Sequence, residues 1–246
     1  MNVLITGATG FIGTNLKKRI EMEFPSCNIF ATSSRTCLDD TLEYAKKSDF
    51  IFHLAAVHRP KSEKEYEDVN CRLLGEILGV LSAINNPCPV LYTSSIQAGN
   101  GSAYGLSKTH AEDILRIHAQ RMKSRSIIYR LTNTFGPYGR PNGHSVVATF
   151  CYNINRGLPI KINDPNHEMS LYYIDDVCDS FISRFIEKKC DDSKIYKLPE
   201  SLTYEITLGD IATLLYRFKN AIDNDEQINV ESEFEKKLLS TFLSYK

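Results

Sequence analysis

The chain has 246 residues, with 29 Lys and Arg against 30 Asp and Glu, and its formal net charge is −1. This balance gives no reason to expect nucleic acid or an anionic membrane as a partner. A hydrophobic content of 42% is ordinary for a globular protein with a sizeable core. The sequence has no apolar run long enough to span a bilayer and no secretory leader, so we expect a cytoplasmic protein.

Seven cysteines are scattered along the chain, and none forms a C-x-x-C pair with another. Their odd number and irregular spacing predict neither a disulfide framework nor a zinc site, and we expect no metal. Reduced thiols also favour the cytoplasm as the compartment.

Five short runs in the first 135 residues are almost continuously apolar, which is typical of strands buried on both faces of a parallel sheet. Helical patterns lie between these runs, so the order of elements predicts βαβ units and an α/β fold. Residues 1–135 are therefore expected to form a doubly wound parallel sheet. The expected strands are Asn2–Thr6, Asn28–Thr32, Asp49–Leu54, Val90–Ser94 and Ser126–Leu131. The expected helices are Phe11–Glu23, Leu42–Lys47, Asp68–Ile84 and Tyr104–Lys123.

Residues 136–246 are expected to form mainly a small substrate-binding region, with some segments returning to the sheet domain. The segment 135–165 is rich in glycine and proline, as loops are, around one expected helix. The expected elements are a helix at His144–Arg156, a strand near Lys194–Leu198 and a helix at Leu208–Asn220 that opens at Thr207. A final amphipathic stripe is left to pack on the same chain, on a sister subunit or on a separate protein: Phe234, Leu238, Leu239 and Phe242.

Three glycines join the first strand to the first helix in the stretch “TGATGFIG”. Gly7 permits a tight turn, Gly10 leaves room for a diphosphate beside the backbone, and Gly13 lets the helix lie close to the strand. The N–H groups of the helix N-terminus then attract the phosphates. The pattern predicts a dinucleotide site of the Rossmann type, with further contacts from Thr9, Phe11 and Ile12.

The end of the second expected strand indicates which dinucleotide binds. Folds that bind NAD place an Asp or Glu there, where it contacts the ribose hydroxyls. Here the chain reads Ser33-Ser34-Arg35, and no acid appears before Asp39. Two hydroxyls and a guanidinium suit a 2′-phosphate, which a carboxylate would repel. We therefore expect NADP in preference to NAD.

A second set of reactive residues follows the fourth expected strand. Ser95 lies at the carboxyl end of that strand, where open α/β sheets bind their ligands. Tyr104 and Lys108 are four residues apart at the start of a helix, so both side chains project from one face. We expect the lysine ammonium to lower the pKa of the Tyr104 phenol below its usual value of about 10, which would make it a general acid near neutral pH.

The chain resembles the extended short-chain dehydrogenase/reductase family, which comprises nucleotide-sugar epimerases, dehydratases and reductases. The stretches that carry the resemblance are “TGATGFIG”, “SDFIFHLAA”, “YTSSIQA”, “YGLSK”, “YRLTNTFGP” and “YYIDDV”. The resemblance implies that Ser95 hydrogen-bonds the substrate carbonyl oxygen and that Tyr104 exchanges a proton with it. It also implies that Lys108 holds the nicotinamide ribose and tunes Tyr104.

Further contacts are expected at the same edge of the sheet. The family resemblance implies that Leu54, Ala55 and Ala56 pack along the cofactor and that Asn133 meets the diphosphate side of the substrate. We also expect cofactor contact near Leu131 and substrate contacts from Gln97 and His144.

Longer stretches resemble the reductase domain of CapF-type capsular polysaccharide enzymes, and this similarity runs nearly end to end. They include “SSIQA”, “HSVVATFCYNINRGLPIKIND” and “ITLGDIATLLYRFK”. That family reduces a UDP-2-acetamido-2,6-dideoxy-4-ketohexose with NADPH in the synthesis of capsule and O-antigen precursors. The resemblance therefore implies an NADPH-dependent sugar-nucleotide oxidoreductase.

The chain departs from this family in two places. CapF-type proteins continue into a metal-binding cupin domain that performs a preceding epimerisation, and this sequence stops at Lys246 before any such domain. We therefore expect the epimerase half to be either absent or supplied elsewhere, for example by a separate cupin epimerase as partner. An arginine that binds the sugar-nucleotide phosphate in many extended members is also missing from Met169–Asp176. Arg140 or Lys161 is the expected substitute for that arginine.

Other reactions remain as alternatives. A 4,6-dehydratase of this family uses a carboxylate pair directly after the serine or threonine, but Ile96 and Gln97 occupy those positions. A nucleotide-sugar 4-epimerase would share the three reactive residues, and a non-catalytic NADP-binding partner or sensor would share the fold. The sequence also leaves open a homodimer and the choice between UDP and dTDP.

Overall fold

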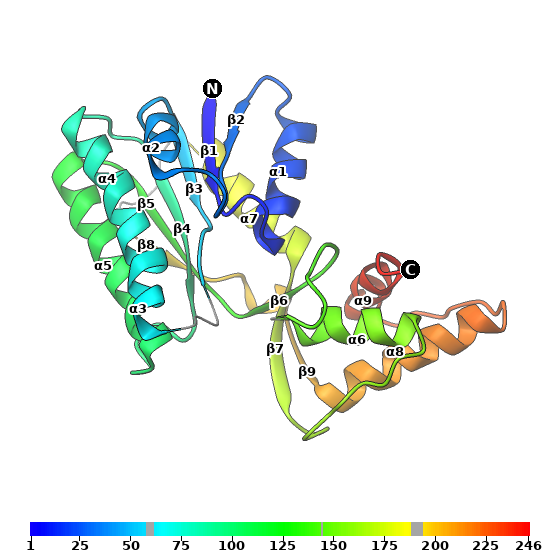
Figure 1. The fold of residues 1–246 in the computed structure, drawn as a ribbon. Helices are drawn as coiled ribbons and strands as arrows, with labels where there is room; N and C mark the ends of the chain where they lie inside the picture. Colours follow the sequence, from blue (N-terminus) through cyan, green and yellow to red (C-terminus); the bar gives the residue numbers. More distant parts are fainter. Residues whose placement is uncertain (58–61, 144, 188–193) are drawn as a thin grey trace. The chain divides into compact units, whose positions relative to one another are not determined.

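The computed structural model describes residues 1–57, 62–143, 145–187 and 194–246 (Figure 1). The chain forms two compact units. The first comprises Met1–Leu131 with Cys178–Lys197, and the second comprises Thr132–Val177 with Leu198–Lys246. None of the helices in the described ranges is both long and apolar enough to cross a lipid bilayer.

The first unit contains a six-stranded sheet in the order β2-β1-β3-β4-β5-β8, and every pairing between neighbours is parallel. The chain starts at β1, moves outward to β2 and then returns to the other side of β1 as β3. Ligands of open α/β sheets bind at such a reversal. This is the doubly wound parallel sheet predicted from the sequence. The strands are β1 (Asn2–Thr6), β2 (Asn28–Ala31), β3 (Phe50–His53), β4 (Val90–Ser95), β5 (Ser126–Leu131) and β8 (Lys194–Tyr196).

Helices cover both faces of this sheet, which explains its continuous apolar strands (Figure 1). On one face, α2, α4 and α5 enclose a buried cluster that includes Leu4, Leu74 and Leu115. On the other face, α1 and α7 pack, and the Phe185 ring lies 5.2 Å from that of Phe50. The helices are α1 (Phe11–Glu23), α2 (Leu38–Lys46), α4 (Leu73–Ala83), α5 (Ala103–Met122) and α7 (Ile174–Ile186).

The expected helix at Asp68–Ile84 is wrong in its details. The chain forms a short helix α3 (Glu63–Tyr66), then a π-helical segment η1 (Glu67–Arg72), and only then α4. Asn70 and Cys71 are both fully buried, although they are neighbours in the sequence. A π-helical turn contains an extra residue and shifts the faces of a helix, so the regular apolar pattern of the sequence does not reveal it.

The second unit contains a three-stranded sheet that the sequence analysis missed, in the order β6-β7-β9. β6 runs parallel to β7, whereas β9 is antiparallel to it. These strands are short or only half-buried, and they therefore lack the continuous apolar pattern of the first sheet. The elements are β6 (Asn133–Phe135), α6 (Val146–Asn155), β7 (Glu168–Tyr173), a 3-10 turn η2 (Glu200–Leu202), β9 (Thr203–Thr207), α8 (Leu208–Asp223) and α9 (Glu233–Leu243).

The C-terminal amphipathic stripe packs on its own chain. Phe234, Leu238 and Phe242 of α9 are buried, and Leu239 is half-buried. The Phe242 ring lies 6.3 Å from that of Phe218 in α8. Of the three surfaces that the sequence left open, the second unit itself covers the stripe.

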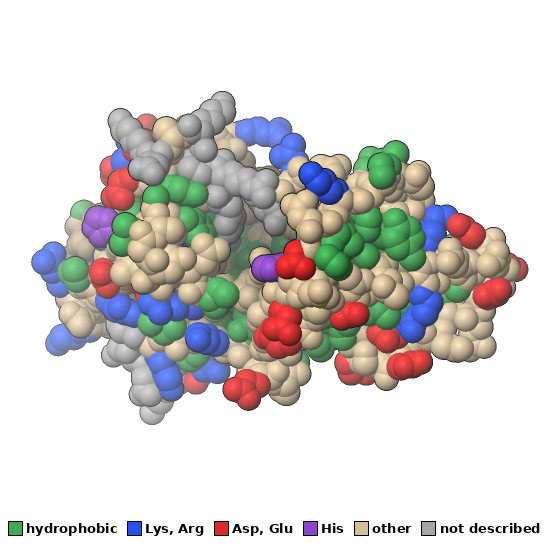
Figure 2. All heavy atoms as spheres, turned by 90° about the horizontal axis from the view of Figure 1, so that it is seen from below, with side chains coloured by type: hydrophobic (Ala, Val, Ile, Leu, Met, Phe, Trp, Pro, Cys, Tyr) green, Lys and Arg blue, Asp and Glu red, His purple; other side chains and the backbone are tan. Residues whose placement is uncertain are grey.

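Charged side chains of both signs are scattered over the face of the molecule shown in Figure 2. This mixture agrees with the formal net charge of −1.

Replacing Phe242 by alanine should destabilise the second unit. The ring is fully buried, so its removal leaves a cavity that costs about 3–5 kcal/mol. Urea unfolding followed by circular dichroism measures the loss, and Leu243→Ala is the matched control because Leu243 is 42% exposed. Equal losses in the two variants would contradict the packing of α9.

Candidate active site

The glycine turn lies against the end of β3. Gly7 has φ +67°, and a Cβ there would lie 2.8 Å from the backbone nitrogen of Ala55. A Cβ on Gly13 would overlap the carbonyl oxygen of Gly7. The turn itself is closed by a 2.9 Å hydrogen bond from the Gly10 N–H to the Gly7 carbonyl. A larger residue at Gly7 would therefore push the turn away from the end of β3, and one at Gly13 would push α1 away from the turn.

The N-terminus of α1 fits a phosphate group. Gly10 is its cap residue, and among the described residues no side chain caps the helix and no acid stands in its first turn. The first N–H groups of a helix lack partners within the helix and carry its positive dipole end. A diphosphate placed there would meet donors and no competing carboxylate. Thr9 and Gly10 are exposed, whereas Phe11 and Ile12 are half-buried.

The Ser33–Thr36 turn follows β2 and stands beside the glycine turn. Its start is tied to that turn by a 2.9 Å hydrogen bond from the Ala8 N–H to the Thr32 carbonyl. The Ser33 hydroxyl accepts from the Arg35 N–H at 3.3 Å. Ser34 and Arg35 are exposed, and within the described part of the chain the Arg35 guanidinium has no hydrogen-bond or ion-pair partner. This cation is therefore available to an anion.

The segment after β3 is held by hydrogen bonds from both sides. The Ala55 N–H donates to the Thr6 hydroxyl at 3.2 Å, and the Val57 N–H donates to the Asn70 amide oxygen at 2.9 Å. Leu54, Ala55 and Ala56 are half-buried there. Leu131 ends β5 at the same edge of the sheet, and its carbonyl accepts from the Ile96 N–H at 3.0 Å.

Ser95 and Tyr104 are brought together by a close approach at Gly105. A Cβ on Gly105 would overlap the Gln97 carbonyl and the Asn100 side chain, so only glycine lets the loop after β4 lie on the first turn of α5. That turn is capped by Ser102, whose hydroxyl accepts from the Gly105 N–H at 3.0 Å. Ser95 then hydrogen-bonds Tyr104, which lowers the tyrosine pKa in opposition to burial.

The expected pKa of Tyr104 is wrong in direction. Burial raises it to about 12, the hydrogen bond to Ser95 opposes this rise, and Tyr66 adds to it. Lys108 does not lower it, because the lysine is itself buried and burial lowers its pKa to about 7. The Lys108 Nζ donates to the Thr93 carbonyl at 2.9 Å and lies 5.7 Å from the centre of the Tyr104 ring. The prediction counted the charge of the lysine and omitted the desolvation of both groups.

His53 and Tyr92 surround Lys108 within the core. The Lys108 Nζ lies 4.9 Å from the centre of the Tyr92 ring. Burial, with a smaller effect of Lys108, lowers the pKa of His53 to about 3, so this imidazole is neutral. Its Nδ1 lies 3.1 Å from the Thr6 hydroxyl.

The sequence analysis missed Glu112, which is fully buried below Lys108. Its carboxylate accepts from the Ser94 hydroxyl at 2.5 Å and from two nitrogens of Arg130 at 2.8 and 2.7 Å. These bonds tie α5 to β4 and β5. The sequence does indicate that Glu112 lies near the site, because Tyr104, Lys108 and Glu112 follow one another at intervals of four residues and so share one helix face.

The remaining substrate candidates divide between the units. Gln97 is exposed in the first unit, and its N–H donates to the Ser95 hydroxyl at 3.1 Å. Asn133, Arg140 and Lys161 are exposed in the second unit. His144 lies outside the described residues.

Within the second unit, Asp176 accepts from the Lys237 amine at 2.9 and 2.7 Å. The same amine also donates to the Tyr204 hydroxyl at 3.0 Å. This carboxylate therefore links α7 to α9 and β9.

Residues 3–198 match the NAD dependent epimerase/dehydratase family. The chain belongs to this family. It is 37% identical over 245 residues to a UDP-2-acetamido-2,6-beta-L-arabino-hexul-4-ose reductase of Pseudomonas aeruginosa, covering 100% of this chain and 65% of that protein. It is 24% identical over 224 residues to a dTDP-4-dehydro-6-deoxyglucose reductase of Escherichia coli, covering 73% and 71% of the two chains.

Solved structures agree with these matches. The capsular polysaccharide assembling protein CapF of Staphylococcus aureus superimposes with a TM-score of 0.88 at 37% identity, covering 100% of this chain and 66% of that one. A UDP-glucuronic acid 4-epimerase of Bacillus cereus in complex with NAD shares the fold, with a TM-score of 0.82 at 16% identity and coverage of 100% and 96%. The resemblances to the extended family and to CapF-type proteins are confirmed. The chain spans less than two thirds of the Pseudomonas and Staphylococcus proteins.

Replacing Lys108 by methionine should change how stability depends on pH. Between pH 7 and 10.5 the unfolded chain keeps a proton on Lys108 that the folded chain has lost, so this group makes the free energy of unfolding rise with pH. From pH 7 to 9 the free energy of unfolding of the wild type should rise relative to that of Lys108→Met by up to about 1.4 kcal/mol per pH unit. Urea unfolding of the cofactor-free proteins measures this gain. A difference that is constant with pH would show that the amine keeps its ordinary pKa.

Proposed function

We propose that this chain uses NADPH to reduce the C4 ketone of a UDP-2-acetamido-2,6-dideoxy-4-ketohexose, a step in making capsule or O-antigen precursors. The observation that carries the proposal is the set of Ser95, Tyr104 and Lys108 on β4 and α5, in the same unit as the glycine turn. The Pseudomonas relative is named as a reductase of this kind, which supports the substrate class.

The residues present fit a nicotinamide dinucleotide. The uncapped start of α1 would hold its diphosphate, and the half-buried Leu54–Ala56 backbone would line its path. Arg35, with Ser33 and Ser34 beside it, supports NADP over NAD because a guanidinium can pair with a 2′-phosphate. When bound, this cofactor supplies the hydride.

The protein's own residues would then donate the proton to the ketone oxygen and stabilise the phenolate that remains. Ser95 would orient the ketone by a hydrogen bond to its oxygen. The raised pKa keeps the Tyr104 phenol protonated at neutral pH, and an alkoxide forming on C4 is a stronger base than a phenolate, so the proton moves from Tyr104 to the substrate oxygen. The phenolate that remains is stabilised by its hydrogen bond to Ser95 and by protonation of the nearby Lys108 amine.

Two neighbouring positions argue against dehydration. Removing water across C5 and C6 needs a general base and a general acid in addition to Tyr104. The residues after Ser95 are Ile96 and Gln97, and neither side chain can donate or take up a proton. A ketone reduction needs no further acid or base.

The substrate and partner assignments also remain proposals. Gln97, Asn133 and Arg140, with Lys161 as a further cation, would contact the sugar nucleotide, and His144 stays a prediction. We further propose that the reaction occurs in the cytoplasm and that a cupin epimerase supplies the keto sugar. Size-exclusion chromatography with light scattering would test for a homodimer.

Replacing Tyr104 by phenylalanine should lower kcat for NADPH oxidation with the 4-keto sugar nucleotide by about 10²–10⁴-fold, because the proton donor is lost. NADPH affinity, measured by fluorescence titration, should change little. Tyr216→Phe is the matched control, since Tyr216 is 44% exposed in the second unit. Wild-type turnover in Tyr104→Phe would overturn the mechanism, and isomerisation without net NADPH consumption would favour the 4-epimerase instead.

Replacing Arg35 by alanine should weaken NADPH binding by about 10–100-fold, since a hydrogen bond to a charged group contributes about 1.5–3 kcal/mol. NADH binding should change little, because it carries no 2′-phosphate. Arg121→Ala is the control, because Arg121 is also an exposed arginine but lies in the last turn of α5. Equal losses for the two cofactors would refute the role of Arg35.

A further inference from the structure

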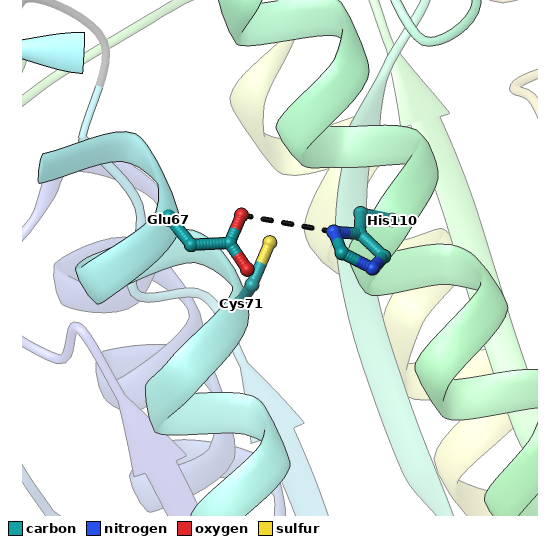
Figure 3. A group of neighbouring side chains, drawn as sticks. All are labelled: Glu67, Cys71 and His110. Carbon is teal, nitrogen blue, oxygen red and sulfur yellow. Dashed lines mark ion pairs between the residues drawn. The ribbon is translucent and has the colours of Figure 1, made fainter. Parts of the chain in front are cut away.

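Three potential metal ligands meet beside η1 and α5, although no cysteine spacing in the sequence indicates a metal site. Glu67 and Cys71 belong to η1 and His110 to α5, and one ligand atom of each lies within 4.8 Å of the other two. Figure 3 shows the Glu67 carboxylate and the Cys71 sulfur directed toward the His110 ring. The Glu67 oxygen and the His110 Nδ1 are 3.7 Å apart.

Cys71 is the fixed member of this cluster. Its residue is 1% exposed, and its thiol donates to the Ser107 carbonyl at 3.3 Å. The preceding residue, Asn70, is also fully buried and donates to the Ser107 hydroxyl at 3.1 Å. In contrast, the side chains of Glu67 and His110 are 58% and 61% exposed, so they can rotate toward the sulfur at little cost.

We propose that Glu67, Cys71 and His110 bind one Zn²⁺ ion, with water in the fourth position. Thiolate, imidazole and carboxylate are the ligands that Zn²⁺ takes in proteins, whereas Mg²⁺ and Ca²⁺ prefer oxygen alone. Tetrahedral Zn²⁺ requires ligand atoms about 3.3–3.6 Å apart, given its bond lengths of about 2.0–2.3 Å. The Glu67–His110 separation is already close to this, and the sulfur distance closes by rotation of the two exposed side chains.

The surroundings leave room for water at the fourth position. An open groove runs along the outer face of η1 and α5, lined by Tyr66, Glu67, Leu106, Ser107 and His110. When the ion binds, the Cys71 S–H bond breaks, its proton passes to solvent, and a sulfur–zinc bond forms. No redox step is involved.

A bound ion would fasten η1 to α5. Tyr66, which precedes Glu67, lies with its ring 5.7 Å from that of Tyr104, and His110 follows Lys108 by two positions. The site would therefore fix the segment beside the reactive tyrosine. An ion that binds the folded chain alone also raises its stability in proportion to ln(1 + [Zn²⁺]/Kd).

Optical titration of the metal-free full chain with Co²⁺, which substitutes for Zn²⁺, tests the proposal without any cofactor or sugar. We expect one ion per chain, intense visible bands of a tetrahedral site and a near-ultraviolet thiolate-to-metal band, all reversed by Zn²⁺. Cys71→Ser should abolish the thiolate band. His110→Ala and Glu67→Gln should weaken binding by about tenfold or more, since even outer-shell changes cost about 10–100-fold.

Two controls separate this site from adventitious binding. Cys37→Ser should leave the titration unchanged, because Cys37 is exposed and its replacement keeps a helix-capping acceptor for the Asp40 N–H. His167→Ala removes an exposed histidine of the second unit and should likewise have no effect.

The exposed His110 keeps the test decisive even if Cys71→Ser folds poorly. Zn²⁺ should raise the melting temperature of the wild type and not that of His110→Ala. Equal Co²⁺ binding by wild type and His110→Ala, or a spectrum without a thiolate band, would overturn the proposal. The proposed reductase activity would stand in either case, because none of these measurements depends on it.

Discussion

The attachment of α5 to β4 through buried polar groups is the constraint on which the reactive site depends. A helix that packs on a sheet normally presents apolar residues, yet Lys108 and Glu112 are both fully buried on this face. Unpaired, such groups cost several kcal/mol each. Lys108 donates to the Thr93 carbonyl, and Glu112 is held by Ser94 and Arg130. These hydrogen bonds hold the helix against β4 and β5, and in this placement Tyr104 lies beside Ser95 at the end of β4.

Close backbone approaches complete what the polar groups begin. At Gly105 the loop that follows Ser95 lies directly on the helix that carries Tyr104, so the serine reaches the phenol. At Gly7 and Gly13 the glycine turn lies directly against the end of β3 and on itself. A methyl group at any of these three positions would separate two segments that must touch. The shape of the glycine turn and the position of Tyr104 therefore depend on the absence of a side chain at these three glycines.

Apolar patterns explain which parts of this structure the sequence could predict. The bounds of β1, β5 and α1 match the expected ranges because the two strands are almost wholly buried and α1 follows directly on the glycine turn with one buried face. The π-helical η1 and the half-exposed strands β6, β7 and β9 leave no such pattern. The motif residues Ser95, Tyr104 and Lys108 could be placed from spacing alone. The pKa of Tyr104 could not, because it depends on how much water burial removes from each group.

The two faces of α5 carry different chemistry, and Ser107 stands at the boundary between them. Tyr104, Lys108 and Glu112 point toward β4, whereas Leu106 and His110 line the outer groove with η1. The Ser107 hydroxyl donates to the Tyr104 carbonyl at 2.8 Å and accepts from the buried Asn70 amide. Asn70 in turn holds Val57, the residue after Leu54–Ala56, by accepting from its backbone N–H. A change in η1 would therefore move both the backbone after β3 and the first turns of α5, because the Asn70 amide is hydrogen-bonded to Val57 on one side and to Ser107 on the other.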